Sequence, residues 1–195
     1  MKRYINYTKY VLRHKWFVFK YCIELGVPLW IAIFHDWDKF LPSEFISYAR
    51  TFNKPDGSKQ YVPSDAFDYG WLVHQNCNKH HWQYWVLMMD DGSTKLVPMP
   101  DVYRREMLAD WRGAGAALGF PDTKGWYLKN RDKMKLHPRT RAWVEEQLKV
   151  ETVVSTVGLG KSIIEDVAPL LKEYDKLKDQ ALHIVNLGKT PKEQQ

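Results

Sequence analysis

The sequence predicts a mainly α-helical protein with one small β-hairpin. Apolar residues recur at three- and four-residue steps along much of the chain, which is the spacing of one helix face. Only residues 84–98 show a β pattern, since two short apolar runs there flank an Asp-Asp-Gly-Ser turn. Hydrophobic residues make up 45% of the 195 residues, which is enough to form the core of one globular domain.

Two successive helices are expected at the start of the sequence. Residues 4–24 form the first, and His14 lies on its apolar face among tyrosine, valine and phenylalanine side chains. A Gly-Val-Pro sequence at residues 26–28 ends this helix and opens the next. The second helix covers residues 29–40 and carries a His-Asp doublet near its end.

Further helices are expected along the rest of the chain. One begins at Pro42, and the others cover residues 65–75, 101–118, 138–149 and 158–187. Ser64 and Asp101 are the expected N-caps, because their side-chain oxygens can accept hydrogen bonds from the first helical turn. We expect residues 1–120 to form a helical core that includes the hairpin. Residues 121–195 would then add helices and a frayed tail to the same domain.

Charge and cysteine content restrict the expected class of protein. The net charge of +6 fits a phosphate-bearing small substrate, whereas nucleic acid is a less favoured partner because the basic residues form no run. Cys22 and Cys77 are not part of a CxxC pair, which argues against a disulfide scaffold. No signal-peptide pattern is visible, and the most apolar stretch, residues 26–34, is too short to span a bilayer. A cytoplasmic protein is expected, and its oligomeric state is left open.

A cluster of histidines and aspartates predicts a metal site. His14 carries polar nitrogens into an apolar helix face, so it needs a partner. His35 and Asp36 come near the end of the next helix, where a short connection between the helices would bring them close to His14. Imidazole and carboxylate together suit Mn, Fe, Co, Ni or Zn, so we expect one or two such divalent ions. Asp38 is expected to face away from this site.

Other candidate ligands follow later in the chain. The side chains of His80 and His81 are expected to diverge, with His81 favoured as the ligand and His80 as a second ligand or a substrate contact. His74 is expected to be either a ligand or a buried core histidine. Asp110 lies on the inward side of its helix, one turn after Glu106, and an inward carboxylate needs a partner such as a metal ion.

The order of these groups resembles the HD-domain superfamily of helical metallohydrolases, whose pattern is H…HD…D. There the first histidine, the doublet and the last aspartate bind metal, and branches with two metals add histidines in between. Over residues 4–118 the resemblance implies an HD-like core with the candidate ligands His14, His35, Asp36, His74, His80, His81 and Asp110. The β-hairpin before the last aspartate departs from that pattern, which leaves the metal count open.

A second resemblance covers most of the chain up to about residue 148. The strings HDWDKF, FDYGWL, HHWQYW and EMLADW resemble a domain-of-unknown-function family of phage and bacterial proteins. That family brings no established activity.

The HD resemblance implies phosphoester hydrolysis, and the many aromatic residues near the motifs favour a nucleotide substrate. Lys39 would pair with Asp36 or hold a substrate phosphate. An arginine would help to steady the developing charge, with Arg104, Arg105 and Arg112 as the candidates. The expected general base is Glu44 or Glu106.

Two other interpretations stay open. A minority of HD-like proteins bind two irons through six ligands and activate oxygen, for which the set here would be His14, His35, Asp36, His74, His81 and Asp110. Alternatively, the chain is a protein- or nucleic-acid-binding protein with a structural or degraded metal site.

The two remaining histidines are not expected to belong to the metal site. His137 is expected at a helix start and His183 at the surface.

Overall fold

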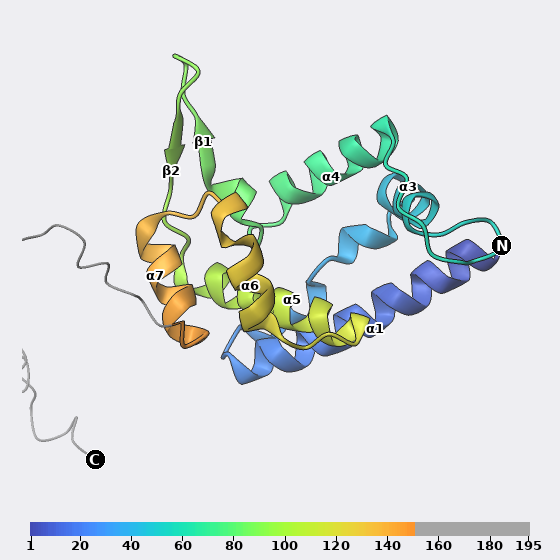
Figure 1. The fold of residues 1–195 in the computed structure, drawn as a ribbon, viewed down its shortest axis with the longest axis horizontal. Helices are drawn as coiled ribbons and strands as arrows, with labels where there is room; N and C mark the ends of the chain where they lie inside the picture. Colours follow the sequence, from blue (N-terminus) through green and yellow to red (C-terminus); the bar gives the residue numbers. More distant parts are fainter. Residues whose placement is uncertain (151–195) are drawn as a thin grey trace, which may run out of the picture. The chain divides into compact units, whose positions relative to one another are not determined.

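The computed structural model describes residues 1–150, and this part of the chain confirms a mainly helical fold with one hairpin (Figure 1). Its α-helices are α1 (Lys2–Glu24), α2 (Leu29–Phe34), α3 (Pro42–Phe52), α4 (Asp65–Cys77), α5 (Asp101–Leu118), α6 (Thr123–Asn130) and α7 (Pro138–Gln147). Its 3-10 helices are η1 (Trp37–Phe40), η2 (Trp82–Trp85) and η3 (Arg131–Lys133). The expected helix over residues 158–187, the tail and His183 lie outside the described residues.

Helices α1 and α5 pack closely against each other (Figure 1). Their close approach requires a glycine, because a Cβ on Gly113 would lie 2.4 Å from Cγ2 and 2.8 Å from the backbone nitrogen of Val18. His14 lies about one turn before Val18 on α1, and Asp110 lies about one turn before Gly113 on α5. The glycine contact therefore brings these two predicted metal ligands close together.

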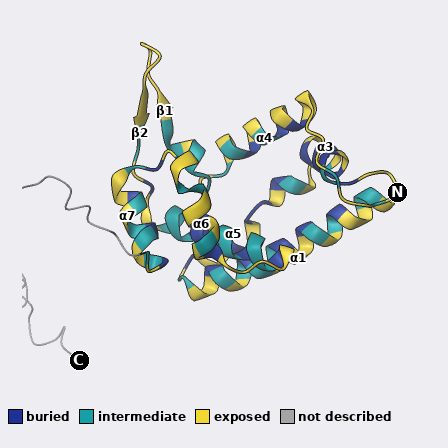
Figure 2. Ribbon diagram, in the orientation of Figure 1, coloured by how far each residue is buried: buried dark blue, intermediate teal, exposed yellow. Residues whose placement is uncertain are grey.

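Within residues 1–150 the apolar core forms three clusters, of which two lie on either side of His14 along α1 and the third joins α5, α6 and α7. Val11 belongs to a cluster with Tyr48 and Phe67 that joins α1, α3 and α4. Val18 belongs to a cluster with Ala109 that joins α1, α2 and α5. Burying one valine side chain, such as that of Val11 or Val18, contributes roughly 1.5–3 kcal/mol to stability. Each helix buries one face and exposes the other (Figure 2). The two clusters hold the backbone of α1 in place on both sides of the buried, polar His14.

The prediction of one continuous helix over residues 29–40 was wrong. Helix α2 ends at Phe34, and Asp36 adopts a left-handed conformation with φ of 51° before η1 begins. Aspartate is one of the few residue types other than glycine that adopt this conformation readily. The break lets two neighbouring side chains, His35 and Asp36, both turn into the protein interior, where each is at most 2% exposed.

The helix caps agree with the sequence in part. Ser64 caps α4 as predicted, since its hydroxyl accepts a hydrogen bond from the backbone of Phe67, and His137 caps α7 at the expected helix start. The cap assigned to Asp101 was wrong, because Pro100 occupies that position and Asp101 is the first helical residue. Its carboxylate instead pairs with arginines one turn later in the helix.

The hairpin lies at the predicted place but is shorter than residues 84–98. Strand β1 (Val86–Met88) pairs antiparallel with β2 (Thr94–Leu96), and the residues before β1 form η2 instead. Helix α6 was not predicted, and α7 ends two residues before Lys149, which adopts a positive φ of 50°. None of the helices in residues 1–150 is both long and apolar enough to cross a membrane.

Candidate metal centre

The centre is assembled from five segments that the fold brings together. Helix α1 supplies His14, and the break between α2 and η1 supplies His35 and Asp36. Helix α4 and the turn after it supply three more histidines, and α5 supplies two acidic residues one turn apart. These residues are His74, His80, His81, Glu106 and Asp110. All the predicted ligands therefore converge on one region. The expectation that the side chains of His80 and His81 diverge was wrong, because their ring centroids lie 4.3 Å apart and both can reach the same candidate metal position.

Asp36 lies at the middle of the centre, with each carboxylate oxygen facing a different pair of histidines. Its Oδ2 lies 3.3 Å from Nε2 of His14 and 3.3 Å from Nε2 of His35. Its Oδ1 lies 3.4 Å from Nε2 of His74 and 3.3 Å from Nε2 of His80. One carboxylate is thus shared by two groups of donor atoms.

The two donor groups share only Asp36. The first consists of His14, His35, Asp36 and Asp110, and the second of Asp36, His74, His80 and His81. In each group the donor atoms lie within 4.8 Å of one another. Oδ1 of Asp110 completes the first group at 3.2 Å from His14 Nε2 and 3.4 Å from His35 Nε2. Ligand atoms around a tetrahedral ion at about 2.1 Å are separated by about 3.4 Å, so both groups have the dimensions of a metal site.

Several inward-facing atoms of these groups lack hydrogen bonds. Within residues 1–150, the buried atoms without a hydrogen-bond partner include Nε2 of His14, His35, His80 and His81, and Oδ1 of Asp36. Buried polar atoms without partners are costly, so a concentration of them in one place needs an explanation. Imidazole nitrogens and carboxylate oxygens at these spacings can hold a metal ion, which would satisfy them together.

Glu106 orients one histidine from each donor group. Its Oε1 lies 3.0 Å from Nδ1 of His35 and 3.3 Å from Nδ1 of His80. An imidazole that donates its Nδ1–H to a carboxylate presents an unprotonated Nε2, which is the form that binds metal. Glu106 is therefore placed to fix both rings.

A second pair of carboxylates orients His74. Its Nδ1 lies 3.0 Å from Oδ2 of Asp38 and 3.1 Å from Oε2 of Glu44. The expectation that Asp38 faces away was wrong, because the break in the backbone before η1 turns this side chain inward. Neither Glu44 nor Glu106 lines the pocket described below, so the structure places both predicted bases behind the histidines.

Charge in the centre shifts several pKa values. Burial opposes ionisation of Asp36, but the neighbouring charges of His35 and Lys39 hold the pKa of its carboxyl well below the usual range. Burial likewise opposes protonation of His74, but its contacts with the carboxylates of Asp38 and Glu44 outweigh burial and raise its pKa to about 9. Lys39 donates to Oδ2 of Asp36 at 2.5 Å, which is the first of its two predicted roles.

His81 differs from the other histidines in its electrostatics. Burial and the positive charge of His80 together hold the pKa of its imidazole well below the usual range. The Trp71 ring packs edge to face against it, with ring centroids 5.1 Å apart. His81 is therefore neutral at pH 7, as a metal ligand must be.

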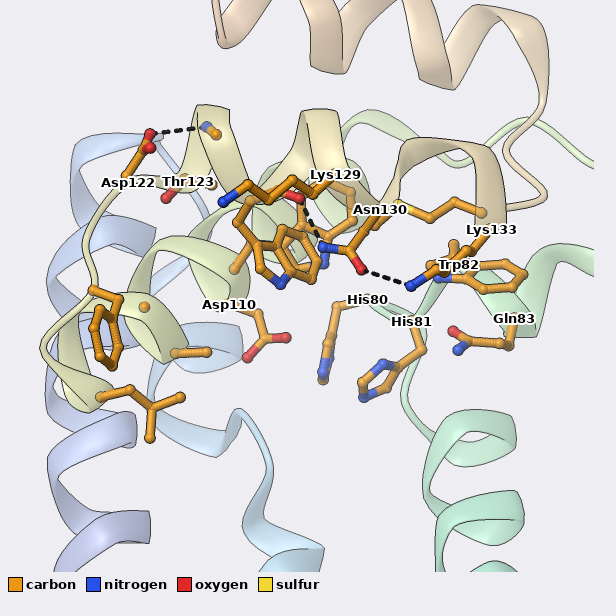
Figure 3. Close-up of a pocket in the computed structure, with 18 of the residues that line it drawn as sticks. His80, His81, Trp82, Gln83, Asp110, Asp122, Thr123, Lys129, Asn130 and Lys133 are labelled. Atoms are coloured by element: carbon orange, nitrogen blue, oxygen red, sulfur yellow. Dashed lines mark hydrogen bonds between the residues drawn. The ribbon is translucent and has the colours of Figure 1, made fainter.

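A pocket of about 750 Å³ opens beside the centre, within the range of about 300–1,000 Å³ typical of small-molecule sites. His80, His81 and Asp110 belong both to the donor groups and to the pocket wall (Figure 3). Much of the remaining wall is aromatic or aliphatic: Trp71, Trp82, Trp111, Leu118, Phe120 and Trp126. The pocket can thus bring a partly apolar molecule to the centre.

The cations of the pocket are not the predicted arginines. Arg104 and Arg105 pair with Asp101 at the start of α5, and Arg112 does not line the pocket. Lys129 of α6 and Lys133 of η3 line it instead, together with other residues of α6. The sequence carries a signal for this face, since Trp126, Lys129, Asn130 and Lys133 recur at helical spacing.

Comparison with known protein families identifies a match. The model of a family of unknown function (DUF5662) matches residues 3–150. No curated protein matches the chain, and no solved structure does.

Proposed function

We propose that this chain, which belongs to the family of unknown function DUF5662, is a two-metal phosphohydrolase that acts on a nucleotide or a related phosphoester. The observation that carries this proposal is the position of Asp36. Each of its oxygens faces a separate group of inward-turned imidazoles, as expected for a carboxylate that bridges two divalent ions. The likeness of the sequence to the H…HD…D pattern supports the same conclusion.

The reaction would add water across a phosphoester P–O bond and release an alcohol and phosphate. Divalent ions in such a centre lower the pKa of bound water and neutralise charge on the phosphoryl group. His80, His81 and Asp110 lie where the centre meets the pocket, so a substrate phosphate can approach from the pocket. Glu106 and Glu44 hold the rings of His35, His80 and His74 in place.

A di-iron oxygenase is the second candidate, because the donor groups contain five histidines and only two carboxylates. Imidazole-rich donor sets suit iron better than they suit magnesium. Two equivalents of iron together with oxygen consumption would favour the oxygenase. Phosphate release with Mn or Co and without oxygen uptake would favour the hydrolase.

The direct test is phosphate release from a panel of nucleotides by protein purified without chelator and supplied with Mn, Fe, Co, Ni or Zn. We expect activity in the wild type and its loss in Asp36→Asn, where an amide oxygen and nitrogen replace the two carboxylate oxygens. Asp68→Asn, at an exposed position on α4, is the matched control and should stay active. Metal-loaded protein that releases no phosphate, or equal activity in Asp36→Asn, would overturn the proposal.

A further inference from the structure

We propose that the wall of the pocket formed by α6 and η3 binds a second phosphate group. The substrate would then be a nucleotide that carries one phosphate besides the scissile one, as a nucleoside 3′,5′-bisphosphate does. This inference rests on the proposed function, because the metal centre is taken to hold the scissile phosphate.

The first observation is the arrangement of side chains along α6 and η3, which follow each other in the chain. Trp126, Lys129, Asn130 and Lys133 all line the pocket. In Figure 3, the labelled Lys129, Asn130 and Lys133 lie across the pocket from His80, His81 and Asp110. The pocket therefore has a metal-binding side and a separate cationic side.

The second observation is that both lysine charges are left without a carboxylate. Neither Lys129 nor Lys133 takes part in any of the ion pairs formed within residues 1–150. Lys133 donates a hydrogen bond at 3.5 Å to the neutral side chain of Asn130. Asp122 also lines the pocket, but its Oδ1 accepts the backbone N–H of Gly125 at 2.8 Å and caps α6. The ammonium groups are thus available to an anion in the pocket.

The third observation is the aromatic surface beside these cations. Trp111 and Trp126 both line the pocket, with ring centroids 5.3 Å apart and an interplanar angle of 57°. Trp111 also stacks on the buried Tyr127 at 6.0 Å, which holds its ring in place. Trp126 is 44% exposed, so it offers a large aromatic surface on which a base can stack.

These features match a nucleotide with two separate phosphates better than they match simpler ligands. Inorganic phosphate would fill little of the 750 Å³ pocket. A nucleoside monophosphate bound at the metal centre would leave the lysines unpaired. A second phosphate on the same sugar would engage them, while the base packs on the tryptophans.

The test is calorimetric titration of the metal-loaded full chain with adenosine 3′,5′-bisphosphate, adenosine 5′-monophosphate and inorganic phosphate. We expect the bisphosphate to bind roughly tenfold more tightly than the monophosphate, the equivalent of one charge-assisted hydrogen bond. The preference should weaken with added salt and disappear in the double variant Lys129→Met/Lys133→Met. Lys135→Met, an exposed lysine outside the pocket, is the matched control and should keep it.

Equal binding of the two nucleotides, or a preference that survives in the double variant, would overturn the inference. Phosphate release measured in parallel separates this failure from failure of the proposed function. If phosphate is released from the monophosphate but the bisphosphate does not bind more tightly, the second phosphate site is contradicted and the proposed hydrolase is not. A lysine-dependent preference without release from any nucleotide would instead support the second phosphate site and contradict the hydrolase.

Discussion

The ammonium of Lys39 lies 2.5 Å from Oδ2 of Asp36, the same oxygen that faces His14 and His35. The side chain of Asp36 is fully buried, so its charge needs this partner. A metal ion bound to Oδ2 would also neutralise the buried negative charge of Asp36. The Lys39–Asp36 pair would therefore link the stability of the metal-free protein to the proposed metal binding.

Replacement of Lys39 with methionine should destabilise the metal-free protein by about 3 kcal/mol, because it leaves a buried carboxylate without its cation. With metal bound the loss should be smaller. Urea unfolding with and without chelator measures both values, and Lys9→Met, an exposed position on α1, serves as the control. An equal loss in both states would show that the metal does not act on Asp36.

The metal-free protein should lose stability as pH rises from about 6.5 to about 9. Burial of His74 opposes its protonation, but Asp38 and Glu44 outweigh burial and raise its pKa from 6.5 to about 9. The folded state then binds this proton more tightly than the unfolded state does. The resulting stabilisation, roughly 3 kcal/mol, is complete below pH 6.5 and is lost as pH rises through 9.

Metal binding should show the opposite pH dependence, since His74 must release its proton to bind an ion. Affinity should rise over the same window, which titrations at several pH values can measure. In the double variant Asp38→Asn/Glu44→Gln, the stability of the metal-free protein should depend less on pH than it does in the wild type. If the stability of the metal-free wild type is constant or increases between pH 6.5 and 9, the raised pKa of His74 is wrong.

Substitution of Glu106 with glutamine should weaken metal binding by about 10- to 100-fold. One oxygen of Glu106 accepts from His35 and His80, which belong to different donor groups, so both ions should be affected. Competition with a chromogenic chelator gives the affinities. Glu146→Gln, an exposed position on α7, should bind metal like the wild type, and if Glu106→Gln does so too, the orienting role is wrong.

Gly113→Ala should lower the free energy of unfolding by about 2 kcal/mol or more, because the added Cβ overlaps Val18 and pushes α1 away from α5. The same displacement should weaken metal binding, since it separates His14 from Asp110. Gly70→Ala is the matched control within a helix, because its Cβ would meet only Ser47 Oγ at 3.3 Å and atoms farther away. Chemical denaturation and metal titration of both variants test this prediction. If Gly113→Ala changes neither the free energy of unfolding nor the metal affinity, the close packing of α1 on α5 is contradicted.

Periodicity was sufficient to predict most helices and the inward position of His14, because both follow from which face a helix buries. It could not predict the break at Asp36, since a left-handed residue there is stabilised by contacts with distant segments. Nor could it show that Asp38 turns toward His74, 36 residues away. The cationic side of the pocket was missed because the apolar periodicity of α6 is weak, and because only the folded chain brings Lys129 of α6 and Lys133 of η3 into the same pocket as His80 and Asp110.

Metal content, measured after equilibration with metal and removal of free ion, shows whether Asp36 joins two metal subsites. We predict two equivalents in the wild type, and about one in each of His14→Asn and His81→Asn, since each histidine belongs to a single donor group. Asp36→Asn should lose most of both, with helical content by circular dichroism showing that every variant is folded. A folded wild type that binds one ion or none, or His14→Asn and His81→Asn variants that each retain two, would contradict the account.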